Sequence, residues 1–459
     1  MNSQESKQAE KLEPGTAVRG VRRLGVVGRH LFRSDANALS PQPRNTMAER
    51  AVCINPVAAA TTTLSASSEA SSSSDYLHLD ELLSASEKEI RYRVRSFSQK
   101  EILPIIDDYY ERAAFPHELL PKLAALNLCS GNIQGYGCPK MSGLECGLVA
   151  MELAKVDAGM ATFYSILQPI SMLSIYKSGS EEQKKELLPK MASLQLIGCF
   201  GLTEPDAGSD ASNLYTTAKK VEGGWLLNGR KRWIGNGTFA DVIIIWAINA
   251  DTKKVHGFIV RKGARGLKTI KIENKIALRA VQNADIVLED CFVPDQDQLV
   301  AAKDFKTGPA SSLFLTRIMA GWIALGTAMG AYERCLAYLK QRRQFGVPLA
   351  RLQILQEKVV RMLGTIQCIT LLCWRVSSLY DARTLSFGQA SLAKATSTRM
   401  ARSVLKLARE CMGGNGVVTD FGVARAFADI EAVYTFEGSY EINSLITGRE
   451  VTGHAAFRP

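Results

Sequence analysis

Between residues 196 and 300 the periodicity of the chain changes from helical to strand-like and then changes back. Residues 242–247 and 256–260 are short runs rich in β-branched and aromatic side chains, bounded by polar turns, which is typical of strands. Gly223-Gly224 and Asn228-Gly229 are typical of hairpin turns. The sequence therefore predicts a small antiparallel β domain set between two helical blocks.

Helical patterns flank this segment, in residues 75–195 before it and 301–459 after it. Ser84 with Glu87 three positions later is typical of a capping box at a helix start. Residues 144–156 are mostly apolar, with one internal glycine, and favour another helix. A chain of 459 residues exceeds one ordinary domain, so we expect packed subdomains with these boundaries.

Residues 1–74 are rich in Ser, Ala and Arg and lack sustained periodicity, which predicts a targeting segment followed by a disordered linker. Residues 23–31 run Arg-Leu, five further residues and His-Leu, and resemble the N-terminal peroxisomal import nonapeptide. A helix there would place its basic, aliphatic and histidine side chains on one face for an import receptor. The rival is a mitochondrial or plastid transit peptide, against which Glu5, Glu10 and Glu13 count. The C-terminal Phe457-Arg458-Pro459 differs from a Ser-Lys-Leu peroxisomal address.

Composition narrows the class of partner. The net charge of +11 is that of a solvated surface or of one that attracts a polyanionic, nucleotide-bearing small molecule. Nucleic acid is disfavoured because no basic block is interleaved with aromatics. The ten cysteines form no CxxC pair and the five histidines have no ligand spacing, so we expect reduced thiols and no metal site. We also expect no membrane span, since no uninterrupted apolar run is long enough.

Glu437 is the strongest candidate for a catalytic acid or base in the sequence. It lies between Tyr434, Phe436 and Tyr440, where poor solvation should raise the pKa of its carboxyl group. Such a carboxylate can act as a base toward a weakly acidic C–H. Gly438 lets the backbone bend and lets a flat ligand approach closely.

Two segments of the predicted β domain carry a family resemblance. Residues 201–210, Gly-Leu-Thr-Glu-Pro-Asp-Ala-Gly-Ser-Asp, resemble the first signature of the acyl-CoA dehydrogenase and oxidase family, although Asn213 departs from the small residue expected at its end. Residues 231–237 resemble the family's next flavin-contacting turn, which would place Trp233 beside the isoalloxazine. Backbone N–H groups and hydroxyls of such a loop can bond a polar ring or a phosphate.

Two further motifs lie in the second helical block. Arg342, in the pattern Arg-x-Gln-Phe-Gly, resembles the arginine that binds the flavin pyrophosphate of a neighbouring subunit, and a guanidinium suits that role. Gln353 occupies the matching later position. Residues 410–420, continued by Arg425 and Asp429, fit the family's second signature. Their glycines do not follow a strand, so we exclude a nicotinamide-binding Rossmann domain.

The resemblance covers residues 75–456 and implies an α+β, mainly α protein: an N-terminal helical domain (75–195), a central antiparallel β domain (196–300) and a C-terminal four-helix bundle (301–459). It implies FAD as cofactor, Glu437 as catalytic base, and Ser209, Arg317 and Gly438 as contacts of an acyl-CoA thioester. The implied flavin contacts are Phe200, Leu202, Thr203, Gly208, Ser209, Trp233, Ile234, Gly235, Arg342, Phe345, Gln353, Glu410, Met412, Gly413, Gly414, Ser439 and Glu441, with serine replacing the more usual threonine at 439.

Residues 135–138 and the Glu437-Gly438 segment are most similar to the glutaryl-CoA dehydrogenase branch and the plant short-chain acyl-CoA oxidase beside it. The glutaryl enzymes carry an arginine for the distal carboxylate shortly after a Val-Asp pair, but Val156-Asp157 is followed by Ala-Gly-Met-Ala-Thr. A buried carboxylate without a partner is costly, so this departure predicts a plain short acyl chain.

Together with the nonapeptide, this departure favours a peroxisomal oxidase of fatty-acid β-oxidation that returns electrons to O₂ and makes H₂O₂. The alternatives are a mitochondrial dehydrogenase that uses an electron-transfer flavoprotein, and a catalytically silent flavin-binding scaffold. A flavin held across subunits predicts a homotetramer.

Overall fold

The computed structural model describes residues 73–129 and 133–455. The predicted import nonapeptide at 23–31 and the C-terminal residues 457–459 lie outside the described residues. Serine capping boxes begin three of the first helices, at Ser84, Ser142 and Ser180, and the one at Ser84 was predicted from the sequence. The helices before the sheet are η1 Leu79–Leu82, α3 Ala85–Phe97, η2 Ser98–Ile102, α4 Ile106–Glu111, η3 His117–Leu119, α5 Leu120–Ala125, α6 Gly143–Val156, α7 Ala158–Ser165, η4 Ile166–Met172, α8 Leu173–Ser178 and α9 Glu181–Ala192.

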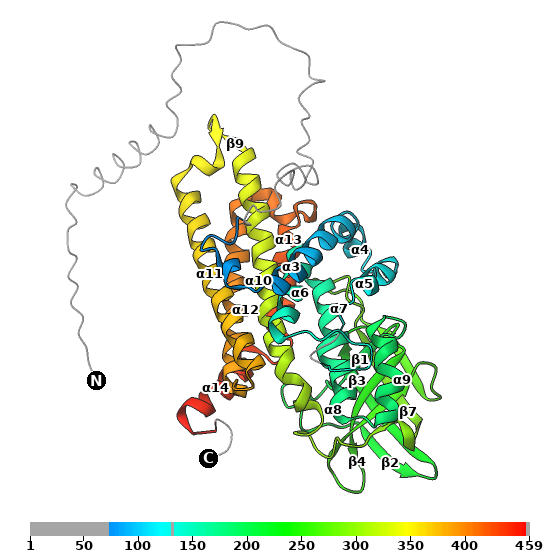
Figure 1. The fold of residues 1–459 in the computed structure, drawn as a ribbon. Helices are drawn as coiled ribbons and strands as arrows, with labels where there is room; N and C mark the ends of the chain where they lie inside the picture. The colour runs from blue at the N-terminus through cyan, green and yellow to red at the C-terminus, as the bar shows by residue number, and fades with distance from the viewer. Residues whose placement is uncertain (1–72, 130–132, 456–459) are drawn as a thin grey trace, which may run out of the picture. The chain divides into compact units, whose positions relative to one another are not determined.

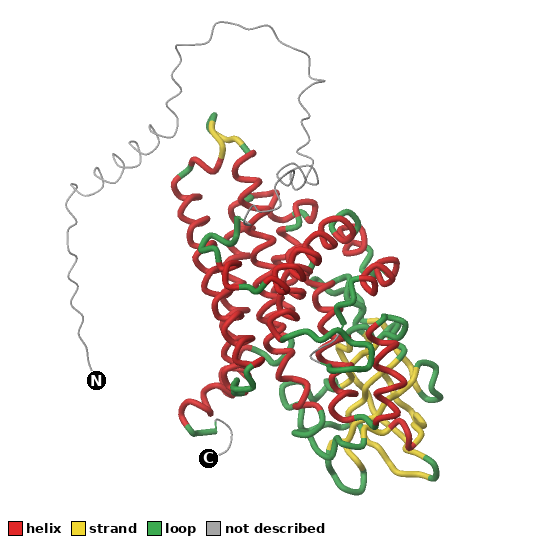
Figure 2. The backbone as a smooth tube through the Cα atoms, in the orientation of Figure 1, coloured by secondary structure: helices red, strands yellow, loops and turns green. Residues whose placement is uncertain are grey.

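Strands β1 to β8 form one sheet beside these helices (Figures 1 and 2). They are β1 Gly198–Gly201, β2 Thr217–Val221, β3 Gly224–Ile234, β4 Val242–Asn249, β5 Val255–Arg261, β6 Leu267–Lys271, β7 Ala284–Pro294 and β8 Gln298–Leu299, with the short helix η5 Asp295–Asp297 before β8. The order is β6-β7-β3-β2-β4-β5-β8, with β1 paired to β4. Most pairs are antiparallel, as predicted, but β4 pairs in parallel with both β1 and β2.

The apolar run of β4 is explained by burial on both faces. Val242, Ile244 and Trp246 belong to the large core that the sheet shares with the helices. Ile243 and Ile245 belong to a second core on the other face, with side chains of β3 and β7. A strand covered on both faces reads as a continuous hydrophobic run and does not alternate with polar residues.

One predicted turn is wrong. Gly223 forms the β2–β3 hairpin as expected, since Val221 pairs with Gly224. Asn228 and Gly229 lie inside β3, at an irregularity of its pairing with β7. Gly229 has φ 148, and a side chain there would overlap Thr216, so this glycine serves a bulge.

The C-terminal helices form the predicted bundle around α10, which is buried along most of its length. Gly326 and Gly330 allow α10 to approach α6 closely, because a Cβ on either would overlap the backbone carbonyl oxygens of Met151 and Lys155. The elements are α10 Pro309–Gln341, β9 Arg343–Gln344, β10 Val347–Pro348, η6 Leu349–Arg351, α11 Gln353–Asp381, α12 Phe387–Cys411, η7 Gly413–Val417, η8 Thr419–Phe421, α13 Val423–Thr435 and α14 Tyr440–Thr452.

Two of the described helices, α10 and α11, have the length and mean hydropathy of a membrane span, 1.4 in each case. The sequence expectation missed them because polar residues interrupt both apolar stretches. The most apolar stretch of α10 is 89% buried inside the protein, so α10 is a core helix of the bundle. The most apolar stretch of α11 is only 33% buried. On the exposed side of this helix lie Ile354, Val360 and Leu371.

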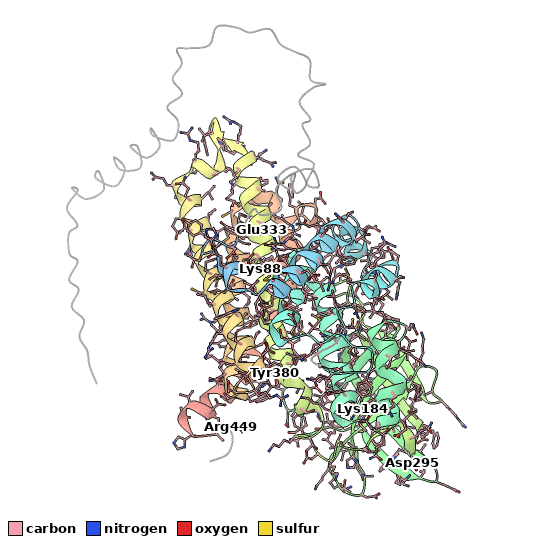
Figure 3. All side chains as sticks on the ribbon, in the orientation of Figure 1. Lys88, Lys184, Asp295, Glu333, Tyr380 and Arg449 are labelled. Atoms are coloured by element: carbon pink, nitrogen blue, oxygen red, sulfur yellow. The ribbon has the colours of Figure 1, made fainter. Side chains whose placement is uncertain are left out.

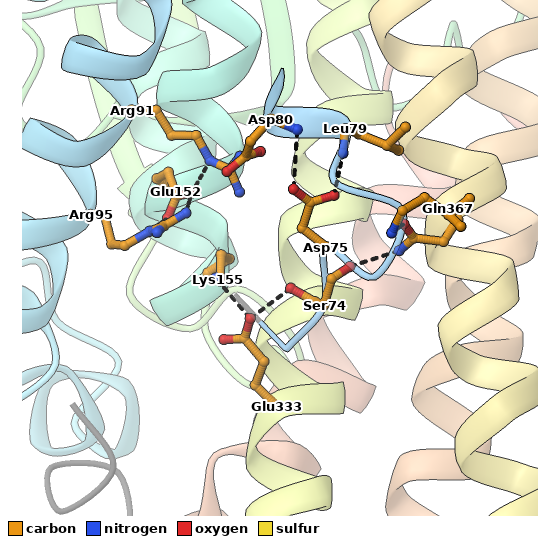
Figure 4. A network of polar contacts seen from close by, with 11 residues as sticks. Ser74, Asp75, Leu79, Asp80, Arg91, Arg95, Glu152, Lys155, Glu333 and Gln367 are labelled. Atoms are coloured by element: carbon orange, nitrogen blue, oxygen red, sulfur yellow. Dashed lines mark hydrogen bonds and ion pairs between the residues drawn. The ribbon is translucent and has the colours of Figure 1, made fainter. Parts of the chain in front are cut away.

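Polar contacts fasten the start of the described chain to the bundle (Figure 4). The buried Ser74 donates to Glu333 of α10 at 2.6 Å, and its carbonyl accepts from Gln367 of α11 at 2.7 Å. Arg91 of α3 donates to Glu152 of α6 at 2.7 Å beside them. Figure 3 labels Glu333 among all the described side chains. Ser74 therefore belongs to the fold, although the sequence assigned it to the linker.

Candidate active site

Glu437 lies in the short turn between α13 and α14. Its backbone is left-handed, with φ 56, and Gly438 after it has φ 83. Glycine adopts this region freely, whereas a glutamate is strained there, a cost that recurs at functional sites. Asn443 of α14 donates to the carbonyl oxygens of both residues, at 3.2 and 2.8 Å, and so holds the turn.

The carboxylate of Glu437 points toward the first half of α10. Thr316 Oγ1 donates to Glu437 Oε2 at 2.5 Å. Burial raises the pKa of Glu437, and the Thr316 hydroxyl and the charges of Arg317 and Lys394 only partly oppose that rise. The rise agrees with the expectation from the aromatic sequence context. A half-buried carboxylate with a raised pKa is suited to accept a proton near neutral pH.

Arg317 lies in the wall of the bundle beside Glu437. Its side chain is buried, donates to Ser391 of α12 at 2.9 Å and lies over the Phe387 ring at 4.1 Å. Burial lowers the pKa of Arg317 to about 10, while the charge of Glu437 raises it. Among the described residues, its Nε has no hydrogen-bond partner.

The two motif segments of the β domain meet, as the resemblance implied. The Arg232 N–H, just before Trp233, donates to the Thr203 carbonyl at 2.8 Å. The buried Lys231 donates to the Leu202 carbonyl at 3.1 Å and to the buried Glu204 at 2.7 Å. Glu204 also accepts from the backbone N–H groups of residues 215 and 216, so this ion pair fixes the whole 202–216 loop.

This loop leaves a surface that fits a flat, polar ring. The Trp233 side chain is 52% exposed, and its backbone is left-handed with φ 65. Gly208 and Ser209 are exposed, and a Cβ on Gly208 would meet no atom within 4 Å. Thr203 and Phe200 are half-buried beside them. An open glycine-serine loop next to an exposed indole offers hydrogen bonds and a stacking face for a flavin.

Other residues that were predicted to contact the flavin have side chains that pack inside the protein. Leu202, Ile234 and Met412 are buried in the core, so only their backbone groups could reach a ligand. Gly235 is buried against Ile166 of η4, which a Cβ would overlap.

The first turn of α14 follows the base directly. Ser439 caps α14 by accepting the Ile442 N–H at 3.3 Å, and Glu441 is exposed in that turn. The pKa of Glu441 is lowered by its own backbone N–H and by the Ser439 hydroxyl.

A second group of predicted flavin contacts lies at the other end of the bundle. Phe345 is 91% exposed on the β9–β10 hairpin, which Figures 1 and 2 show at the end of the bundle away from the sheet. Glu410, at the end of α12, accepts from Lys358 of α11 at 2.8 Å, which joins the two helix ends. The exposed members of this group are Arg342, Phe345, Gln353, Glu410, Gly413 and Gly414.

Glu437 belongs with the sheet end of the molecule. Thr316, its partner, lies in the first half of α10, where Ser312 is hydrogen bonded to Ser174 of α8 at 2.9 Å. The adjoining η4 packs on both α10 and β1, and its Ile166 touches Gly235 of the Trp233 turn. Glu437 and the β-domain loops therefore border the same η4–α10 region, and the hairpin group does not.

Sequence reasoning missed the roles of several residues of this site. Lys231 holds the loop, Thr316 holds the base, and Lys394 and Asn443 hold the turn. The sequence did contain a sign of the role of Lys394. This lysine lies among small residues of α12, such as Ala390 and Ala393, that are buried in the bundle.

The chain belongs to the acyl-CoA dehydrogenase family, whose domains follow the same helical, β and helical order. The family's N-terminal, middle and C-terminal domains match residues 84–195, 199–291 and 310–452. The chain is thus a flavin-dependent oxidoreductase acting on acyl-CoA thioesters, and the expectations for fold and for FAD are confirmed.

Among the relatives, the human mitochondrial short-chain specific acyl-CoA dehydrogenase is 30% identical, over 78% of this chain and 87% of its own. The glutaryl-CoA dehydrogenase of Mycobacterium smegmatis, solved in complex with FADH2, is 36% identical with a TM-score of 0.81, covering 83% of this chain and 98% of that one. The butyryl-CoA dehydrogenase of Megasphaera elsdenii is 29% identical with a TM-score of 0.77, covering 81% and 99%. These relatives are dehydrogenases, so they favour the alternative of the sequence analysis over its oxidase reading.

Proposed function

We propose that this protein desaturates CoA thioesters of short, uncharged acyl chains between the α and β carbons, with Glu437 as the base. The observation that carries the proposal is the half-buried Glu437 carboxylate, whose pKa is raised and whose left-handed turn borders the same region as the β-domain loops. When bound, FAD supplies the acceptor for the hydride that leaves the β carbon.

The chain supplies the proton chemistry and the positioning. Glu437 takes the α proton onto a carboxylate oxygen, and Thr316 holds that carboxylate by its hydroxyl. A backbone N–H beside the base polarises the thioester carbonyl, which stabilises negative charge at the α carbon. Thr203, Ser209 and Trp233 would hold the flavin ring when FAD is bound, and Ser439 and Glu441 would bond it beside the base. Gly438 would leave room for the substrate.

The surroundings of α7 support an uncharged acyl chain. Ala158 to Tyr164 are buried and contain no cation. Nearby, Arg334 donates to the Val156 carbonyl at 3.2 Å, and Arg425 donates to the same oxygen at 2.9 Å. These guanidinium groups are committed to the backbone that precedes α7 and are not offered to a substrate carboxylate.

The substrate proposal is tested by anaerobic titration of the FAD-loaded enzyme. Butyryl-CoA should bleach the bound flavin stoichiometrically, and glutaryl-CoA should not. Bleaching by glutaryl-CoA alone would contradict the proposed substrate class, and no bleaching by any acyl-CoA would favour the silent scaffold.

The first candidate for the electron acceptor is an electron-transfer flavoprotein in mitochondria, and it is supported by the human relative, which is a mitochondrial dehydrogenase. The second candidate is an oxidase that reduces O₂ to H₂O₂ in peroxisomes, as part of fatty-acid β-oxidation. The missing α7 cation, the similarity to the plant short-chain oxidase and the nonapeptide at 23–31 favour it. Peroxide formed with butyryl-CoA in air, without added acceptor, at the rate of substrate consumption would establish the oxidase. Turnover that needs an added electron-transfer flavoprotein would establish the dehydrogenase.

The protein functions as a homotetramer in this proposal. The hairpin group that includes Arg342, Phe345 and Gln353 lies away from Glu437, so it serves the FAD of a neighbouring copy. The exposed apolar side of α11, with Ile354 and Val360, supports contact with a second copy.

A further inference from the structure

A buried lysine from another helix holds both sides of the turn that carries Glu437. Lys394 lies on α12 with its side chain fully buried. Its Nζ donates to the carbonyl oxygens of Tyr434 and Gly438, at 2.7 Å each. A buried ammonium needs such partners, and here both lie on the backbone that flanks the base, three residues before it and one after.

The two carbonyls explain what the lysine does for the backbone. Tyr434 lies in the last turn of α13, where carbonyls lack partners within the helix and a cation complements the helix dipole. The Gly438 carbonyl is shared with the side-chain amide of Asn443, at 2.8 Å. One charged donor from α12 and one neutral donor from α14 therefore hold the strained turn.

Lys394 also contributes charge. The cations that act on Glu437 are Arg317 of α10 and Lys394 of α12. Burial lowers the pKa of Lys394 to about 8, which keeps it mostly cationic at neutral pH. On α14, the exposed Glu441 acts on Lys394 as a second carboxylate.

Two aromatic rings and an ion pair border the outer side of the turn. The Tyr434 ring of α13 stacks on the Tyr440 ring of α14, with centroids 5.9 Å apart. Arg402 of α12 lies over the Tyr434 ring at 4.3 Å and pairs with Glu431 at 2.8 Å. This outer cation is therefore already matched by a carboxylate.

We propose that Lys394 is a positioning residue for the reaction: it fixes the left-handed turn that aims Glu437, and its ammonium stabilises the carboxylate form of that base. The proposal rests on the proposed function of Glu437. Lys394 and Asn443 both bond the Gly438 carbonyl, but only the lysine carries a charge. The proposal therefore predicts different effects when the two residues are replaced.

The test compares Lys394→Met and Asn443→Ala with the wild type, all as full-length, FAD-loaded protein. The rate of anaerobic flavin bleaching by butyryl-CoA is followed by rapid mixing across acidic to mildly alkaline pH. Both variants should reduce the limiting rate. Loss of the ammonium should also raise the pKa of Glu437, and so shift the acid limb of the Lys394→Met profile upward by about one unit. The Asn443→Ala profile should keep its acid limb.

Lys155→Met is the matched control. Lys155 is also largely buried, with its side chain 10% exposed. Its Nζ donates at 3.0 Å to Glu333, the residue of α10 that also accepts from Ser74. Its removal should leave the acid limb in place.

A second variant guards against simple misfolding. Visible absorbance first establishes the flavin content, and Lys394→Arg keeps the charge if Lys394→Met does not retain FAD. Lys394→Arg should lower the rate and leave the acid limb unshifted. A flavin-loaded Lys394→Met with an unshifted limb, or a Lys394→Arg limb shifted upward, would overturn the proposal. Failure of the wild type to bleach would instead overturn the proposed function itself.

Discussion

At the scale of single residues, the site depends on a glutamate held in a backbone conformation that it does not prefer. A left-handed non-glycine residue costs about 1–2 kcal/mol. Glu437 keeps this conformation because Asn443 and Lys394 bond the carbonyls around it, while Thr316 bonds its carboxylate. The strained backbone and the oriented carboxylate are thus held by separate contacts.

Replacing Thr316 with valine should move the pH dependence of flavin reduction. The valine keeps the shape but removes the hydrogen bond that stabilises the Glu437 carboxylate, so the pKa of Glu437 should rise further. The base works as a carboxylate, and its rate falls as pH drops through that pKa. The acid limb of the bleaching rate should therefore move to higher pH.

Thr327→Val is the control for this prediction. Thr327 is a buried threonine of the same helix whose hydroxyl donates to the Ile323 carbonyl at 2.7 Å. Its profile should match the wild type. Superimposable profiles for Thr316→Val and wild type would show that the hydroxyl does not tune the base.

The sequence predicted Glu437 and the rise of its pKa because the aromatic neighbours are local. It did not predict the partners of the carboxylate and the turn. Thr316 lies 121 positions away and Lys394 lies 44 positions from the Gly438 that it bonds. Only the packing of α10 and α12 against the turn brings these groups together.

At the scale of elements, α10 is the support on which the site is built, because it carries Thr316 and packs on the N-terminal helices. The helix α6 and the strand β4 were readable from sequence although both are buried nearly all round, because α6 is a long apolar run and β4 is a short β-branched run between polar turns. Asn228-Gly229 was misread because a bulge and a hairpin use the same residue types, and only the pairing of β3 with β7 distinguishes them.

The close approach of α10 to α6 predicts a large effect of one methyl group. Gly330→Ala should destabilise the protein by roughly 1–3 kcal/mol, because its Cβ would overlap the Lys155 carbonyl oxygen and backbone cannot move aside cheaply. Gly448→Ala in α14 meets no atom within 4 Å and should stabilise the helix slightly. Denaturant unfolding of the FAD-loaded proteins measures both. Equal stability of the two variants would contradict the close-packed α6–α10 contact.

At the scale of the whole molecule, the predicted flavin contacts fall into two groups at different ends of one chain. The β-domain loops border the same η4–α10 region as Glu437, and the β9–β10 hairpin lies at the other end of the bundle (Figure 1). The sequence motifs predicted which residues belong to each group. The resemblance implied that Arg342 serves the flavin of a neighbouring subunit. The distance between the two groups within one chain could not be predicted, since it depends on the lengths and directions of α10, α11 and α12. A second copy reconciles the two groups with one cofactor.

Arg342→Ala should therefore weaken FAD binding and leave Glu437 intact. Loss of a guanidinium bonded to a pyrophosphate should raise the dissociation constant for FAD roughly 10- to 100-fold. Fluorescence titration of the apoprotein with FAD measures this constant. Arg351→Ala, which removes another exposed arginine near the hairpin, serves as the control. Equal losses in the two variants would remove the specific role of Arg342.

The central claim is that Glu437 removes the α proton, and rapid anaerobic mixing of the FAD-loaded Glu437→Gln variant with butyryl-CoA tests it most directly. The glutamine keeps the size of the side chain and cannot accept the proton. The variant should retain its flavin spectrum and bleach roughly 10²- to 10⁴-fold more slowly than the wild type. Bleaching at the wild-type rate would contradict the account.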